Sequence, residues 1–288
     1  MGRSGRGETV RVLCVAPSFY PARIYGGPIE SVCHLCRGLS RNGNEVRVLT
    51  TDANGPRSVL DVRTDCEVPL AEGVRVRYCH RQMSDSVSLT LLRLLPSYIH
   101  WADVVHLTAA YSFPSIPTLL ACKAMGKPVV WAPHGGFQRW EGSTRVRAKA
   151  VWEWICRIGA PKKLILHVTS QEEATASRKR FPGVKAVVIP NGIEIPEKVA
   201  HKYGDGMLRL LYLGRLHPIK GIENLLAACK ILNDRSDLAW SLTIAGTGDP
   251  NYVESLRARV DTLKLVQCVQ MIGAVEGAIK ESLFEEFP

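Results

Sequence analysis

Short apolar runs alternate with amphipathic helical patterns over the N-terminal part of the chain. The runs have the length of buried strands, about four to eight residues, and they lie at residues 10–17, 45–50, 74–78, 103–107, 128–132 and 164–169. A helix is predicted between the first two, with an apolar face formed by Val32, Leu35, Cys36 and Leu39. Because strands alternate with helices, we expect an α/β domain with a parallel, doubly wound, Rossmann-like sheet over residues 1–192.

The pattern breaks into turn residues at 190–196, and we expect an interdomain linker at 193–206. A second strand–helix series follows, with strands at 208–214, 240–245 and near 269–272, a helix near 251–264, and a helix with Ile222, Leu225, Leu226 and Cys229 on one face. A doubly wound domain usually has about five or six strands. We therefore predict that the domain at 207–288 is incomplete, as in a truncated chain or a gene fragment. A compact variant domain is the alternative.

The composition is that of a soluble protein, because 46% of the residues are apolar and 22% are charged. A formal net charge of +10 predicts attraction to anionic partners. Nucleic acid is not expected among them, since the sequence has neither a basic recognition helix nor an aromatic platform. No apolar run reaches the ~18 residues of a membrane-spanning helix, and the basic N-terminus has no signal-peptide core. Nine singly scattered cysteines are typical of reduced thiols, so we expect a cytoplasmic protein.

Two cations mark the strongest candidate binding site. The apolar strand at 208–214 ends in a glycine turn that carries Arg215 and Lys220 just ahead of a helix. A glycine lets the backbone come close to a ligand, and a helix N-terminus offers N–H groups and a positive dipole end. The arrangement suits a diphosphate.

The loop after the first strand ends in the pair Gly26–Gly27 at the mouth of a helix. Two interpretations are equally favoured by the spacing: close backbone approach to a phosphate or sugar, or a flexible loop with Pro28 in the first helical turn. The sequence contains no Walker A motif, and the pair Gly246 and Gly248 lacks the third glycine of a dinucleotide-binding motif, which weighs against a nicotinamide dehydrogenase.

These segments together resemble glycosyltransferase family 4 of the GT-B fold. The family often has a "GR…KG" segment, here at Arg215 and Lys220, and a Gly-Gly pair in the first loop, here Gly26–Gly27. Further similarity lies at residues 132–137, 167–174, 188–193 and 246–249. It extends over about residues 10–283, and the combination is far more specific than any one motif.

The resemblance implies two Rossmann-like domains and transfer of a sugar, with retention, from a nucleotide-diphosphate sugar to an acceptor hydroxyl. It places His134 at the donor sugar, Arg215 and Lys220 at the diphosphate, and Gly246 and Gly248 near the nucleotide. The acceptor would be a carbohydrate or a lipid-linked sugar in cell-surface polysaccharide or glycolipid assembly. No cofactor or metal ion is expected, because GT-B enzymes work without one.

One family element is missing. The family has an E-x7-E motif in its C-terminal domain, whereas Glu285 and Glu286 of this chain are adjacent and do not match it. A non-catalytic, truncated protein that binds a nucleotide or a partner is therefore the alternative function. A sugar-nucleotide epimerase of the GT-B fold is a further alternative, which the glycine loop and the "GR…KG" segment disfavour.

Four other features have a structural interpretation. Ser170 is predicted to cap a helix, with Glu173 completing a capping box, and Asn191–Gly192 to form a turn. The pair Cys33 and Cys36 lacks a second ligand pair, so zinc is not expected. The basic helix at 145–157 is predicted to pack its apolar stripe on the sheet; a peripheral contact with an anionic membrane is the alternative. The stripe consists of Val151, Trp154, Ile155 and Ile158.

Overall fold

The computed structural model divides into two compact units, Met1–Ile193 and Glu194–Pro288. It describes residues 9–71, 73–83, 86–139, 144–192, 206–235, 238–275 and 277–287. Apart from Gly206, the linker expected at 193–206 lies outside the described residues.

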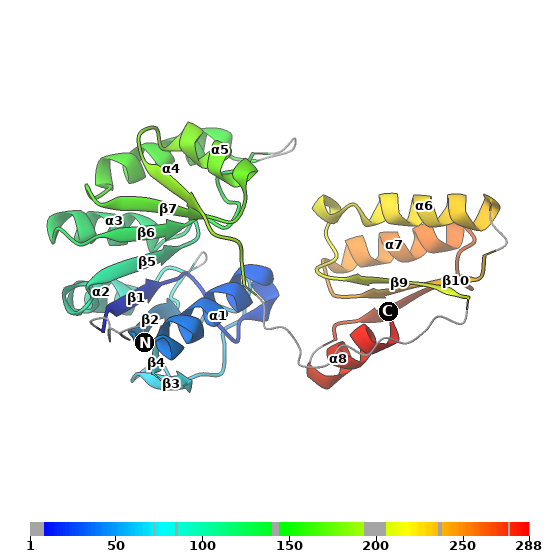
Figure 1. Ribbon diagram of the computed structural model, residues 1–288, viewed down its shortest axis with the longest axis horizontal. Coiled ribbons are helices and arrows are strands. Elements are labelled where there is room, and N and C mark those ends of the chain that lie inside the picture. Colours follow the sequence, from blue (N-terminus) through cyan, green and yellow to red (C-terminus); the bar gives the residue numbers. More distant parts are fainter. Residues whose placement is uncertain are drawn as a thin grey trace, which may run out of the picture. The chain divides into compact units, whose positions relative to one another are not determined.

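The N-terminal unit is built on an eight-stranded sheet in the order β3-β4-β2-β1-β5-β6-β7-β8 (Figure 1). The strands are β1 (Arg11–Val15), β2 (Glu45–Thr51), β3 (Val68–Ala71), β4 (Val74–Cys79), β5 (Val104–Thr108), β6 (Val129–Ala132), β7 (Leu164–Val168) and β8 (Lys185–Val188). All neighbouring strands pair in parallel except β3, which is antiparallel to β4. The chain moves outward from β1 to β2 and β4 and then restarts at β5 on the other side of β1. The order therefore reverses between β1 and β5, where doubly wound sheets bind ligands.

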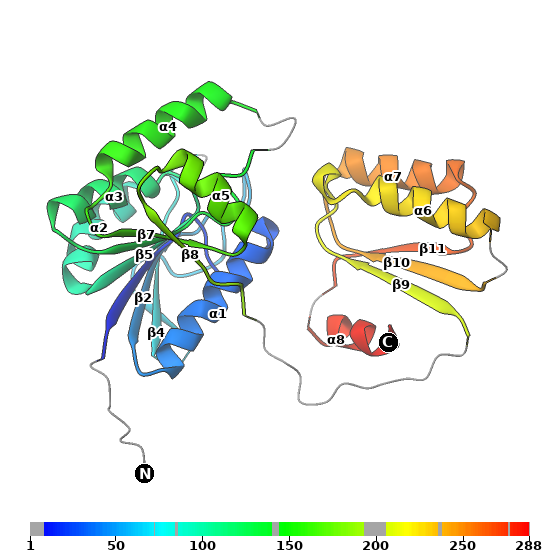
Figure 2. The ribbon, with the colours of Figure 1, turned by 45° about the horizontal axis from the view of Figure 1, so that its top comes forward.

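Helices cover both faces of this sheet (Figure 2). They are α1 (Gly27–Arg41), α2 (Leu89–Trp101), α3 (Ser115–Ala124), α4 (Val146–Gly159) and α5 (Gln171–Arg180), with a short 3-10 helix, η1 (Arg23–Tyr25), before α1. Alternate residues of β1 face opposite cores, as a strand requires. Val12 and Cys14 pack with α1, whereas Leu13 and Val15 pack with α2 and α3. The predicted parallel α/β domain is confirmed.

The six strands predicted in this unit are all present, and the structure adds β3 and β8. β3 was missed because it is a short edge strand that contains Pro69, and proline weakens a strand pattern. The buried face of α1 is also turned relative to the prediction. It consists of Ile29, Val32, Cys33 and Cys36, while Leu35 and Leu39 are only partly buried.

The prediction for the helix at 145–157 was wrong. Val151, Trp154 and Ile158 of α4 are exposed, and the buried residues of this helix are Glu153, Cys156 and Gly159. The reason is that α4 packs against α3. The side of α4 that faces α3 is therefore formed by the small residues Cys156 and Gly159 and by the hydrogen-bonded carboxylate of Glu153. No helix in the described part of the chain is both long and apolar enough to cross a membrane.

The C-terminal unit has a three-stranded parallel sheet in the order β11-β10-β9, with one buried core. Its strands are β9 (Leu208–Leu213), β10 (Trp240–Ala245) and β11 (Val269–Gly273). Its helices are η2 (Pro218–Lys220), α6 (Ile222–Arg235), α7 (Pro250–Thr262) and α8 (Gly277–Glu286). α6 and α7 lie on one face of the sheet and α8 on the other (Figures 1 and 2). Every strand and helix predicted for this region is present.

Candidate functional site

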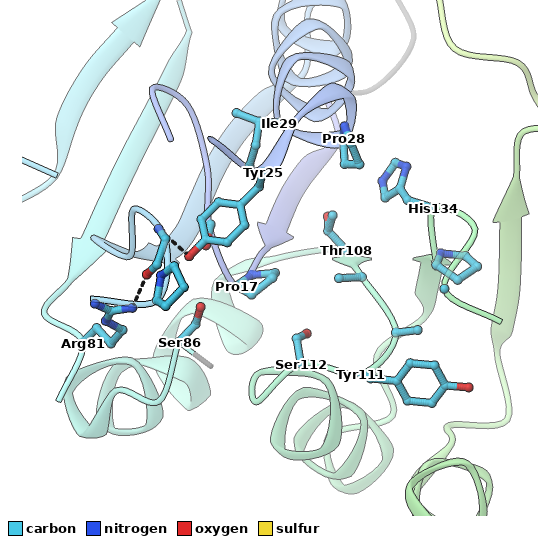
Figure 3. A pocket seen from close by; sticks show the side chains of 17 residues that line it. Pro17, Tyr25, Pro28, Ile29, Arg81, Ser86, Thr108, Tyr111, Ser112 and His134 are labelled. Atoms are coloured by element: carbon cyan, nitrogen blue, oxygen red, sulfur yellow. Dashed lines mark hydrogen bonds between the residues drawn. The ribbon is translucent and has the colours of Figure 1, made fainter. Parts of the chain in front are cut away.

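A cavity of about 450 Å³ opens at the carboxyl ends of the parallel strands of the N-terminal unit. Residues at or after the ends of β1, β2, β4, β5 and β6 line it, together with the start of α1. It therefore lies where the strand order reverses. His134 and Arg81 stand on opposite sides of this cavity, with Thr108 between them (Figure 3).

His134 reaches the cavity from a tight turn that directly follows β6. Its backbone is left-handed, with φ of 49°, and the Gly136 N–H donates to the Pro133 carbonyl at 3.0 Å. A Cβ atom on Gly136 would lie 2.7 Å from Cβ of Ala110, so only glycine lets the turn pack this closely. The turn therefore packs directly against the segment that follows β5.

The His134 imidazole is neutral at physiological pH. Burial, with a smaller contribution from the nearby His106, lowers its pKa to about 4. Its Nε2 atom is buried and has no hydrogen-bond partner among the described residues. A buried polar atom without a partner is uncommon in native proteins. The Nε2 atom is therefore available for a hydrogen bond with a ligand hydroxyl.

Glu173 of α5 holds the His134 turn in place. Its side chain is 2% exposed, and one carboxylate oxygen accepts from the Gly135 N–H at 2.5 Å. The other oxygen accepts from the N–H and the hydroxyl of Thr169, at 2.7 and 2.8 Å. A single buried carboxylate thus ties the loops after β6 and β7 together.

This arrangement corrects the predicted capping box. Ser170 does cap α5, since its hydroxyl accepts from the Glu173 N–H at 3.2 Å. The Glu173 carboxylate, however, bonds Thr169 and Gly135. Sequence reasoning missed the link to Gly135 because a glutamate in the first turn of a helix is also what a capping box requires.

Tyr111 lines one wall of the cavity, and a second buried carboxylate, Glu153 of α4, holds it by a hydrogen bond. The Tyr111 hydroxyl donates to Glu153, and Arg139 donates to the same oxygen at 2.9 Å. Arg180 lies 4.0 Å from it. Burial, followed by this carboxylate, raises the pKa of Tyr111 well above its usual range. No sequence motif marks this cluster, because its members come from four separate segments.

The opposite wall carries a cation that several hydrogen bonds hold in place. The Arg81 guanidinium donates to the carbonyls of Gly55 and Ser58, at 2.6 and 3.0 Å. The Tyr25 hydroxyl accepts from the Gly55 N–H at 2.9 Å (Figure 3). The buried Asp52 anchors the arginine by accepting from its backbone N–H at 2.8 Å. Arg81 was not predicted, since nothing near it in the sequence distinguishes it from other surface arginines.

The predicted glycine pair, Gly26 and Gly27, lies between two residues that line the cavity, Tyr25 and Pro28. Gly26 has φ of 81°, which favours glycine. The space that a Cβ atom would occupy at either glycine is open to at least 4 Å. Pro28 lies in the first turn of α1. Both interpretations of this loop therefore remain predictions: close backbone approach to a ligand, and a flexible loop with Pro28 in the first helical turn.

Arg215 and Lys220 lie in the C-terminal unit, after β9 and before α6, and both are exposed. The Arg215 carbonyl accepts from the Tyr212 hydroxyl at 2.9 Å. His217 caps η2, and Gly221, with φ of 64°, leads into α6. Neither cation forms an ion pair with any residue that the structure describes. Their charges are therefore available to an anion.

Gly246 and Gly248 lie beside the turn that carries Arg215, at positions where another backbone segment comes too close for a side chain. A Cβ atom on Gly246 would lie 1.8 Å from the Gly214 carbonyl oxygen, and one on Gly248 would lie 2.0 Å from the Leu216 oxygen. The backbones that follow β9 and β10 stay paired through the Leu216 N–H, which donates to Thr247 at 2.8 Å. The glycines thus let two strand ends approach closely. Their proximity to a nucleotide stays a prediction.

The predicted site residues fall into two groups, one in each unit: His134 with the glycine loop, and Arg215 and Lys220 with the glycine turn of β10. Among the described residues, no cluster of three or more histidine, cysteine or acidic side chains has the geometry to hold a metal ion. All nine cysteines are free, and Cys33 and Cys36 are buried.

Two family models match the chain. The model described as Glycosyltransferase Family 4 matches residues 25–196, and the model described as Glycosyl transferases group 1 matches residues 196–285. The glycogen synthase of Mycobacterium tuberculosis is 27% identical over 274 residues, which cover 83% of this chain and 62% of that enzyme. The chain thus spans less than two thirds of the length of this curated relative.

Solved structures are similar in fold. Anabaena Alr3699/HepE in complex with UDP and glucose superimposes with a TM-score of 0.65 at 15% identity, covering 93% of this chain and 70% of that one. Sucrose-phosphate synthase from Thermosynechococcus elongatus gives 0.64 at 18% identity, with 93% and 71% covered. These likenesses establish a Rossmann-like α/β architecture of the GT-B type. With the family models matching most of its length, the chain belongs to glycosyltransferase family 4.

Proposed function

We propose that this protein transfers a sugar from a nucleotide-diphosphate sugar to an acceptor hydroxyl, with retention of anomeric configuration. The observation that carries the proposal is the cavity of the N-terminal unit. It lies at the ligand-binding edge of the sheet and contains a neutral imidazole with an unpartnered nitrogen. Membership of glycosyltransferase family 4 supports the reaction class.

The chemical step breaks the bond between the anomeric carbon and the diphosphate oxygen. Negative charge grows on the departing diphosphate while the sugar becomes oxocarbenium-like. We assign the diphosphate to Arg215 and Lys220, whose exposed charges have no ion-pair partner in the described part of the C-terminal unit. The arginine fork engages two oxygens, and the lysine acts as a compact charge. Each contact lowers the barrier by about 2–4 kcal/mol if it strengthens as charge develops.

His134 binds the sugar rather than the phosphate. An imidazole with a pKa of about 4 is uncharged at neutral pH, so it exchanges hydrogen bonds with hydroxyl groups and does not attract an anion. The paired glycines of the first loop leave room for the backbone to approach the same ligand.

A uridine diphosphate sugar is the donor to test first, because Anabaena Alr3699/HepE is described in complex with UDP and with UDP-glucose. We propose a carbohydrate or lipid-linked acceptor in cell-surface polysaccharide or glycolipid assembly, and a cytoplasmic location. All nine cysteines are free, and free thiols are typical of proteins in a reducing compartment. The reaction is proposed to need no metal ion, so a chelator should leave its rate unchanged.

Calorimetric titration with UDP and release of UDP from UDP-glucose test the proposal. Arg215→Ala should weaken UDP binding about tenfold to a hundredfold, the value of one hydrogen bond to a charged group. Arg257→Ala, at an exposed arginine of α7, is the matched control and should leave affinity unchanged. His134→Ala should lower turnover with UDP affinity preserved.

Equal UDP affinity in the wild type and Arg215→Ala would remove the diphosphate site. UDP binding without turnover of any sugar donor would favour the non-catalytic alternative.

A further inference from the structure

The outer side of α4 is apolar and exposed. Val151, Trp154 and Ile158 are 57%, 56% and 51% exposed, and their spacing of three and four residues places them on one side of the helix. The opposite side is the buried one, where Glu153, Cys156 and Gly159 lie. Large apolar side chains therefore point to solvent along most of the length of α4.

Exposed apolar side chains also lie on α3 and at its C-terminal end, and α3 packs against α4. A Cβ atom on Gly159 would lie 3.2 Å from Leu120, so the two helices touch at this end. Lys123 of α3 donates to the Ile158 carbonyl at 2.5 Å. Leu120 is 48% exposed and Met125 is 41% exposed. We name the exposed apolar residues of these two packed helices the α3–α4 surface; it consists of Leu120, Met125, Val151, Trp154 and Ile158.

The charge around the α3–α4 surface has one sign. Exposed cations flank it on both helices and on the segment after α4, namely Lys123, Arg147, Arg157, Lys162 and Lys163. Within the described residues 115–139 and 144–165, Glu153 is the single acidic residue. It is buried and already bonded to Tyr111 and Arg139. The patch thus combines exposed apolar side chains with uncompensated positive charge.

We propose that the α3–α4 surface binds the face of an anionic lipid bilayer, with α4 parallel to the membrane plane. An interfacial helix has large apolar residues and tryptophan on one side and basic residues that reach lipid headgroups. A second copy of the chain is a poorer occupant, because a symmetric contact would bring the same cations together. The proposal is independent of the proposed sugar transfer, since it needs neither nucleotide nor turnover.

Co-sedimentation of the full chain with lipid vesicles tests the proposal. One vesicle is pure phosphatidylcholine, and the other contains about 30% phosphatidylglycerol, whose negative surface attracts basic residues. We expect binding to the anionic vesicle alone, weakened by salt. Removing both cations in Arg147→Ala/Arg157→Ala should weaken partition about 25-fold, or about fivefold per charge.

The contribution of the apolar side chains is tested with the triple variant Val151→Ser/Trp154→Ser/Ile158→Ser, which should weaken partition into vesicles at least about tenfold. Its matched control is Val59→Ser/Ile231→Ser/Val266→Ser, which removes exposed apolar side chains elsewhere and should bind as the wild type does. Circular dichroism and thermal unfolding establish that each variant is folded.

Three outcomes would overturn the proposal: no binding to anionic vesicles, equal binding to both vesicle types, or a triple variant that binds like the wild type. A dimer in sedimentation velocity that the triple variant converts to monomer would assign the surface to a second copy instead.

Discussion

Replacing Glu173 with glutamine tests whether this buried carboxylate positions the His134 turn. The carboxylate accepts from three donors, the Gly135 N–H and the N–H and hydroxyl of Thr169. A glutamine has one acceptor oxygen, so in either orientation its NH₂ group faces a backbone N–H. One hydrogen bond to a charged group is lost, which is worth about 1.5–3 kcal/mol. We expect the free energy of unfolding to fall by about 2–3 kcal/mol.

The assay combines urea unfolding with a spectroscopic measurement at the site. The ring resonances of His134 should shift in Glu173→Gln, because the turn that carries the ring loses its anchor at Gly135. A displacement of about 1 Å costs roughly a hundredfold in rate, so release of UDP from UDP-glucose should fall by about this factor under conditions in which the variant is still folded. Glu172→Gln is the matched control, since Glu172 is the exposed neighbour on the same helix turn.

Glu173→Gln would refute this reasoning if its unfolding free energy stayed within about 0.5 kcal/mol of the wild type, the range of ordinary surface substitutions. Unchanged His134 resonances with lowered stability would leave Glu173 a structural residue without a positioning role.

Three further predictions concern stability. For His134, the folded pKa of about 4 lies below the unfolded value of about 6.5. The unfolded state then binds more protons, and the free energy of unfolding should fall by up to about 3 kcal/mol from pH 6.5 to pH 4; urea titrations of wild type and His134→Asn should show a flatter dependence in the variant. Gly246→Ala should destabilise by more than about 3 kcal/mol in thermal unfolding, because its Cβ would clash with backbone. Gly183→Ala, where φ is 80° and the space for a Cβ atom is open, should cost about 1 kcal/mol. Tyr111→Phe should cost about 1–2 kcal/mol by urea unfolding, since it removes one hydrogen bond to the buried Glu153; no loss would mean that Arg139 alone satisfies this carboxylate.

The sequence alone determined the kind and order of the elements. Strand β10, for example, spans the predicted residues 240–245, and the helix cap at Ser170 is where its side chain and position predict it. Such features depend on neighbours a few residues apart, so apolar period and capping chemistry are sufficient to specify them. The glycine turn that carries Arg215 and Lys220 was predicted for the same reason.

Only the tertiary structure decided which faces and side chains meet across the fold. α4 turns its apolar stripe outward because its small residues and Glu153 fit against α3 and the cavity wall. The spacing of apolar residues along the helix does not predict which side of it faces the protein. Glu173 reaches Gly135, which lies 38 residues earlier, and Arg81 closes a wall with Gly55. These contacts join segments distant in sequence, and the sheet order that brings them together is set by packing of the whole core.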